Sequence, residues 1–229
     1  EQERAAKDRY IQLVYQRYDE VIAAALKDLK PAEISFEQGL AGFAVNRRRS
    51  RGPETRAFGG QVDQDVPVLV VKSDGQLRAV LFGYSCHTTA LGGLSISGDY
   101  AGFAQIELEK QYPGSLAMFV QNCGGDANPL PRIRGNEAEA VKLTSMYGHI
   151  LAESVKQVIA APMKAIAGPL KVVMGETELF LKPGLSLAEL QKKLPGLSGM
   201  AKTEVEHQIN QYKTLGAPPD RVKYPIQVW

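Results

Sequence analysis

The chain has 229 residues, and 44% of them are hydrophobic, which is enough to bury a substantial core in one domain or in a domain with a subdomain. The formal net charge is +2, from 27 basic and 25 acidic residues, so charge gives no reason to expect a nucleic-acid partner or an anionic membrane. No stretch approaches the roughly 20 apolar residues of a membrane span, and residues 1–10 are too charged for a signal peptide. We therefore expect a globular protein that makes at most peripheral contact with membranes.

The first third of the chain predicts a helix, strand-like runs and a long loop. Apolar residues recur at steps of three and four before Pro31, which predicts an amphipathic helix that packs on the core: Ile11, Tyr15, Tyr18, Ile22, Leu26 and Leu29. Residues 33–45 read as strand-like runs interrupted by Gly39 and Gly42. A polar, Arg-rich loop follows over residues 46–64, and loops of this length in compact domains are often functional.

The middle of the chain predicts a β-hairpin followed by a helix and another strand. Residues 66–71 and 77–84 flank Asp74-Gly75, a strong turn signal between antiparallel strands. Asp99 fits the N-cap of a helix over residues 100–111. Residues 115–120 then predict a central strand, parallel to the one that ends near Tyr84.

The last part alternates helices and strands. Asn136 and Glu139 predict a helix start, and the helix is expected to reach Ala161 with a buried face formed by Leu143, Tyr147, Ile150, Leu151, Val155 and Val158. A β-rich run at residues 170–181 precedes two helical pieces, at 186–193 and 198–213. We therefore predict an α/β fold, a mixed sheet flanked by helices, as a single domain over residues 1–229 with a helical excursion at 186–220.

Both ends of the sequence interrupt a structural pattern. The chain opens inside a helical pattern without an initiator Met, and residues 222–229 stop in a β-favouring run without a closing turn. We expect that both ends are cut and that the chain is a fragment of a larger protein.

His87 is the histidine whose position suggests chemistry. His149 and His207 fall on the polar faces of their predicted helices, which favours a surface position. His87 follows an apolar strand and leads into a Gly-rich loop, a setting that suits a metal ligand, a general base or a structural histidine. No second histidine lies at metal-ligand spacing from it, whereas catalytic zinc usually takes three protein ligands.

Two loops and an arginine run are the other candidates. Asp126, after Gly124-Gly125, is either a turn residue or part of a loop whose backbone N–H groups hold an oxyanion. The run of Arg47, Arg48, Arg49 and Arg51 is either a solvated loop or an anion-binding one. Cys86 and Cys123 are either free thiols or a disulfide. No GxSxG, Walker or dinucleotide-binding motif occurs.

Four segments, taken in order, resemble the neutral/alkaline, non-lysosomal ceramidase family. They are VNR at residues 45–47, the strand that ends on His87, SGDYAGFA at 97–104 and QNCGGDANP at 121–129. The resemblance covers roughly residues 10–182, and it implies a zinc-dependent hydrolase of the N-acyl amide bond of ceramide or a related lipid. Zinc lowers the pKa of its bound water and polarises the acyl carbonyl.

The resemblance also implies roles for individual residues. His87 would be one zinc ligand, Arg47 would lie near the substrate amide, and Gly125 and Asp126 would line the pocket. The family's other ligands come from an upstream His-x-His-Ser-Gly-Pro motif and a downstream Glu and Tyr, which these 229 residues do not contain. Asn128 stands where the family has a serine, and an amide cannot act as a hydroxyl nucleophile, although it can donate to an oxyanion.

The expected partner is thus a small lipid amide, and the family implies a secreted or periplasmic protein. Two alternatives stay open: a non-catalytic module whose glycine loops and Arg47 bind an anionic ligand, or a family member that acts on a different amide or ester. The oligomeric state is left open.

Overall fold

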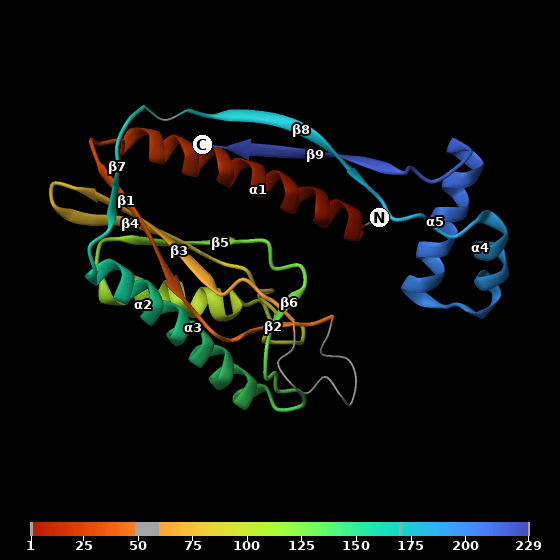
Figure 1. Cartoon of the computed structure of the whole chain (residues 1–229), viewed down its shortest axis with the longest axis horizontal. Coiled ribbons are helices and arrows are strands. Elements are labelled where there is room, and N and C mark those ends of the chain that lie inside the picture. The colour runs from red at the N-terminus through yellow and green to blue at the C-terminus, as the bar shows by residue number, and fades with distance from the viewer. Residues whose placement is uncertain (1, 49–59, 170, 229) are drawn as a thin grey trace. The chain divides into compact units, whose positions relative to one another are not determined.

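A computed structural model describes residues 2–48, 60–169 and 171–228 of the chain (Figure 1). Its contacts divide the chain into two compact units, Glu1–Ala167 and Gly168–Trp229, which are described separately below. The single domain expected from the sequence stays a prediction.

A mixed five-stranded sheet forms the centre of the first unit. Its strand order is β5-β4-β3-β1-β7, and the strands are Leu116–Gln121, Gln76–Tyr84, Asp65–Ser73, Glu33–Leu40 and Lys164–Ile166. β4 and β5 are parallel, with Tyr84 opposite Gln121, and the other neighbours are antiparallel. Helices α2 (Asp99–Gln111) and α3 (Glu137–Ala160) cover one face of this sheet (Figure 1). The predicted α/β class, with a mixed sheet flanked by helices, is confirmed.

The sheet buries alternate residues of its strands, as strands with one face on a core do. Val66, Val68 and Val70 of β3 and Val80 and Phe82 of β4 are almost completely buried. The turn between these strands has positive φ at both Asp74 (53°) and Gly75 (75°), as a tight hairpin requires, so this predicted hairpin is confirmed.

Two predictions about neighbouring elements are wrong in detail. β5 is parallel to β4 as expected, but it lies at the edge of the sheet rather than in its centre. The start of α3 is confirmed, because the Asn136 side chain accepts a hydrogen bond from the Glu139 backbone N–H (3.2 Å). On its predicted buried face, however, Ile150 is 37% exposed, since that position turns away from the sheet.

The N-terminal helix α1 (Gln2–Lys27) forms as predicted and ends before Pro31. Its apolar stripe is not part of the core: the six side chains predicted to pack there are between 36% and 75% exposed. The prediction of a core-packing helix is therefore wrong for the structure described, where an ion pair between Asp28 and Arg78 of β4 ties the segment after α1 to the sheet. Across the described residues, no helix combines the length and apolarity needed to span a bilayer.

The second unit is a two-stranded ribbon with a small helical core. β8 (Val173–Phe180) pairs antiparallel with β9 (Arg221–Val228), and between them lie α4 (Leu187–Lys193), the 3-10 turn η1 (Leu194–Gly196) and α5 (Gly199–Leu215). Leu190, Val205 and Ile209 form the core of these helices. The predicted helices near the C-terminus are confirmed.

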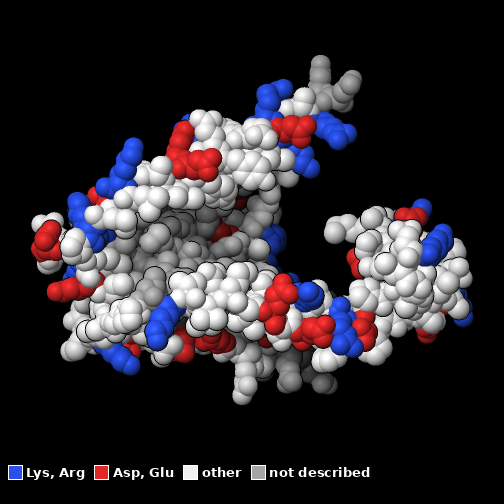
Figure 2. All heavy atoms as spheres, turned by 90° about the horizontal axis from the view of Figure 1, so that it is seen from above, with Lys and Arg blue, Asp and Glu red and all other residues white. Residues whose placement is uncertain are grey.

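The surface carries charges of both signs. On the face drawn in Figure 2, basic and acidic side chains are interspersed rather than gathered into a patch of one sign. The expectation of no nucleic-acid partner stays a prediction.

Candidate active site

A short two-stranded sheet joins two segments that are more than eighty residues apart in the sequence. β2 (Ala44–Asn46) pairs antiparallel with β6 (Ala127–Pro129), with Val45 opposite Asn128. Directly after β2, the Arg47 backbone N–H donates to the carbonyl oxygen of Asp126 (2.7 Å), and the Arg47 Nε–H donates to that of Gly125 (3.1 Å). The structure thus brings Arg47 together with the Gly125-Asp126 loop.

The same loop reaches the segment that carries His87. The His87 backbone N–H donates to the carbonyl oxygen of Ala127 (3.0 Å). Gly124 lies against the backbone of Ser85 and Cys86, where a Cβ atom would come within 2.5 Å of the Cys86 nitrogen. Only glycine fits this approach, so the two predicted loops are in direct backbone contact.

Hydrogen bonds fix the polar side chains around this contact. The Asn46 side-chain amide donates to a carboxylate oxygen of Asp126 (3.1 Å), which holds the half-buried Asp126 in place. Gly125 is exposed, whereas Asn128 is 8% exposed on β6. The structure therefore places all five candidate residues on adjoining segments, and their roles stay predictions.

Cys86 anchors the position of His87 through its backbone. Its carbonyl oxygen accepts hydrogen bonds from the Tyr100 hydroxyl (2.5 Å) and the Gln121 side-chain amide (2.9 Å). Burial raises the pKa of the Cys86 thiol to about 12, so it stays protonated and unreactive near neutral pH. Cys123 is exposed, and both cysteines are free thiols rather than a disulfide.

Asp99 shapes the loop that follows His87. It is the first residue of α2, with Gly98 at the N-cap, so the predicted capping role is wrong. Its buried carboxylate instead accepts backbone hydrogen bonds from Ala90 (3.2 Å) and Leu91 (2.8 Å), as well as from Tyr100 (2.8 Å). Asp99 has a φ of 53°, a strained backbone that these contacts hold in place. Sequence reasoning missed this role because the bonds from Ala90 and Leu91 span nine and eight residues.

The side chain of His87 is suited to hold a metal ion. Its Nε2 is buried and has no hydrogen-bond partner among the described residues. An unpaired buried polar nitrogen costs about 1–3 kcal/mol, and coordination of a metal would remove that penalty. His87 fits as one ligand only, because it belongs to no group of converging potential ligands within the described residues. Such a group is formed instead by Glu107, His149 and Glu153.

Arg132 is a residue near the site that sequence reasoning missed. Its Nη1 donates to the carbonyl oxygen of Thr89 (3.2 Å), two residues after His87. Partial burial lowers the pKa of Arg132, and the positive charges of Arg134 and Arg47 lower it further. In the sequence, the feature that could have pointed to Arg132 is its position three residues after Pro129, the end of the second glycine-rich loop. Of the predicted arginine run, Arg49 and Arg51 lie outside the described residues.

Two solved structures with the same fold are ceramidases. A neutral ceramidase from Pseudomonas aeruginosa aligns with 90% of this chain and 39% of its own, with a TM-score of 0.57 and 19% sequence identity. A ceramidase complexed with C2 aligns with 66% of this chain and 25% of its own, with a TM-score of 0.50 and 18% identity. No family model and no curated protein matches the sequence.

This likeness is one of fold. At this identity it supports the resemblance found in the sequence at the level of the fold, and this chain spans well under half the length of either ceramidase.

Proposed function

We propose that this chain belongs to a zinc-dependent amidohydrolase that resembles neutral ceramidase and hydrolyses the N-acyl amide bond of ceramide or a related lipid. The observation that carries the proposal is the buried, unpartnered Nε2 of His87, next to a loop contact that also holds Arg47 and Asp126. The fold that this chain shares with two ceramidases supports it.

Each candidate residue has a role that follows from its position. A bound zinc ion would supply an activated water molecule and polarise the acyl carbonyl. His87 would hold that ion through Nε2, and hydrogen bonds to the Cys86 carbonyl oxygen and from the His87 backbone N–H hold the backbone from which its side chain extends. Arg47, with Arg132 nearby, would offer positive charge to an amide oxygen that gains negative charge during hydrolysis.

In this proposal, the loop of residues 124–128 would line the substrate pocket. Gly125 leaves its backbone open to a substrate, and Asp126 is held by the Asn46 amide. Asn128 has no hydroxyl group, so we assign it no nucleophilic role and propose a reaction in which water attacks the acyl carbon.

The remaining zinc ligands would come from residues beyond these 229. The ceramidases of the same fold are long enough to hold such residues, since this chain aligns with at most 39% of either one. A secreted or periplasmic location is part of the same proposal and rests on the resemblance alone.

The first prediction concerns His87 in the full-length protein. We expect His87→Ala to lower the zinc-dependent turnover of an N-acyl sphingosine by at least about 100-fold, because removal of residues that merely orient metal ligands already costs 10–100-fold. Release of free fatty acid measures turnover, and zinc content per protein is measured on the same samples. His207→Ala, an exposed helical position in the second unit, is the matched control.

Unchanged turnover and zinc content in His87→Ala would refute the proposal. If the wild-type protein binds anionic ligands in calorimetry but hydrolyses no amide with or without zinc, the binding-module alternative holds instead. Turnover of short N-acyl amides or esters without turnover of ceramide would identify a hydrolase of another substrate.

A further inference from the structure

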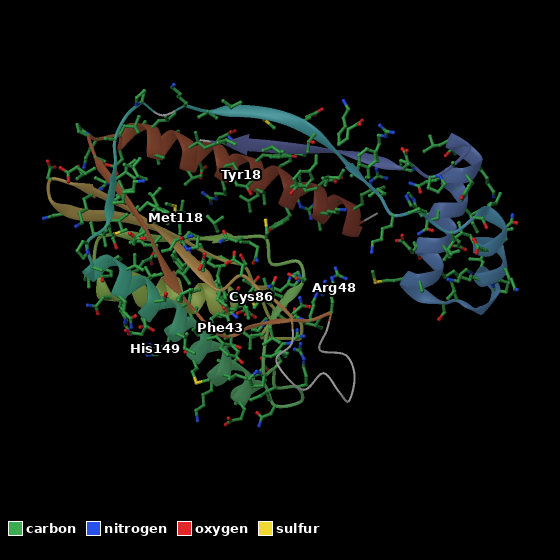
Figure 3. All side chains as sticks on the ribbon, viewed as in Figure 1. Tyr18, Phe43, Arg48, Cys86, Met118 and His149 are labelled. Carbon is green, nitrogen blue, oxygen red and sulfur yellow. The ribbon has the colours of Figure 1, made fainter. Side chains whose placement is uncertain are left out.

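A second set of potential metal ligands lies on the outer surface of the α2–α3 pair. Glu107 lies on α2, and His149 and Glu153 lie four residues apart on α3, where Figure 3 labels His149. His149 Nδ1 lies 3.0 Å from a carboxylate oxygen of Glu107 and 4.0 Å from one of Glu153. The donor atoms of all three residues lie within 4.8 Å of one another. Two ligands bound to one zinc ion are about 3.3 Å apart when each bond is about 2.0 Å long, so these spacings need only a small adjustment.

The scaffold beneath these residues is tightly packed. Gly148, next to His149, lies so close to α2 that a Cβ atom there would come within 2.5 Å of the Phe103 Cβ and 2.8 Å of the Tyr100 carbonyl oxygen. The two helices therefore approach each other closely at the turn that presents His149. Sites built on such elements hold their ligands with little rearrangement.

Lys156 holds the two carboxylates together. Its Nζ donates to Glu107 (2.8 Å) and forms an ion pair with Glu153, and these contacts raise the pKa of Lys156. Partial burial opposes ionisation of Glu107, but the bonds from Lys156 and His149 outweigh it and lower the pKa of that carboxyl. The two carboxylates thus converge on Lys156, and Glu107 Oε2, which lies 3.0 Å from His149 Nδ1, is an oxygen that does not bond Lys156.

An open hollow borders two of these residues, Glu107 and His149. It has a volume of about 640 Å³, and its walls include Glu107 and His149 together with Glu139 and Met146. The exposed ring of His149 faces solvent here, with 58% of its side chain accessible. A metal ion held by three protein ligands at this place would keep a coordination position for water or a small ligand, the arrangement found in open zinc sites.

We propose that Glu107, His149 and Glu153 form a binding site for a divalent transition-metal ion of the zinc class. One imidazole and two carboxylates suit zinc and its first-row neighbours, whereas calcium and magnesium prefer oxygen ligands alone. The site shares no residue with the His87 region, so it stands independently of the proposed hydrolase function.

Titration with Co²⁺ and Zn²⁺ tests this proposal on the chain itself. We expect one Co²⁺ per chain to bind with the visible absorption of a four- or five-coordinate ion, and Zn²⁺ to displace it with a micromolar Kd. His149→Ala, Glu107→Gln and Glu153→Gln should each weaken binding by at least about tenfold. His207→Ala, an exposed helical position, is the matched control and should leave this binding unchanged.

A variant of Lys156 separates a metal site from a plain ion-pair network. Lys156→Met removes the competing positive charge and leaves the two carboxylates to repel each other. We expect this variant to have a lower Tm than wild type without metal and to regain it when Zn²⁺ is added. Absence of saturable binding, binding that survives His149→Ala, or a Tm of Lys156→Met that Zn²⁺ does not raise would each overturn the proposal.

Discussion

At the scale of single residues, Gly124 joins the two loops of the candidate active site. Substitution by Ala would press a methyl group against the Cys86 and Ser85 backbone, at distances of 2.5 and 2.6 Å. We expect Gly124→Ala to lower the free energy of unfolding by about 1–3 kcal/mol, the usual effect of overpacking. Urea unfolding followed by circular dichroism measures the change. Gly125→Ala, one residue on, meets open space and should stay within about 0.5 kcal/mol of wild type; equal losses in both variants would contradict this account.

Residue-level features could be predicted from the sequence where the signal was local. His87 was identified by the strand and the Gly-rich loop around it, and Arg47 and Asp126 by their motifs. Contacts that depend on the tertiary fold had no local signal. The sequence around Asp99 predicts a helix cap, but its carboxylate accepts hydrogen bonds from the Ala90 and Leu91 backbone. Arg132 donates a hydrogen bond to Thr89, which lies 43 residues earlier in the chain. The Glu107–His149 pairing was missed for the same reason, since the two residues lie on different helices.

At the scale of elements, Asn136 defines where α3 begins. Asn136→Ala removes the acceptor for the Glu139 N–H, and we expect the free energy of unfolding to fall by about 0.5–2 kcal/mol. Asn136→Asp keeps the oxygen and adds a negative charge that a helix N-terminus favours, so it should be as stable as wild type. Urea unfolding curves give the free energy of unfolding of both variants. An Asp variant as unstable as the Ala variant would show that loss of the cap does not cause the loss of stability.

Periodicity and turn residues predicted whether a segment is a helix or a strand. They did not predict which other elements that segment packs against. The hairpin at Asp74-Gly75 and the ends of α3 were predicted because their signals lie within a few residues. The edge position of β5 and the exposure of the α1 stripe depend on which elements lie alongside, which periodicity alone does not encode.

At the scale of the whole molecule, buried tyrosine and cysteine side chains make the stability of the fold depend on pH in the alkaline range. Burial raises the pKa values of Tyr84 and Tyr100 and brings those of Cys86 and Tyr147 to about 12. In the unfolded chain these groups lose their protons from about pH 8.5 for cysteine and about pH 10 for tyrosine. The unfolded state then binds fewer protons than the folded one, so stability is full below about pH 8.5 and declines as pH rises toward 12.

Urea midpoints at pH 7, 9 and 10.5 measure this decline. Tyr147→Phe removes one of the linked groups and should flatten the decline between pH 9 and 10.5, even though loss of its hydrogen bond to Pro131 lowers stability at pH 7. A midpoint that stays constant to pH 10.5 in the wild-type chain would be inconsistent with this linkage.

β4 and β5 end opposite each other, and this restricts where residues can be inserted or deleted around the candidate active site. Because Tyr84 pairs with Gln121, the segments that lead to His87 and to Gly124 leave the sheet side by side. Deletion of one residue within β5 would shift its end by about 3.3 Å and turn every side chain to the opposite face, which would exchange buried Ala117 with Met118. Insertions in the glycine-rich loop of residues 91–98 leave this alignment intact, so variation in length belongs in that loop rather than in either strand.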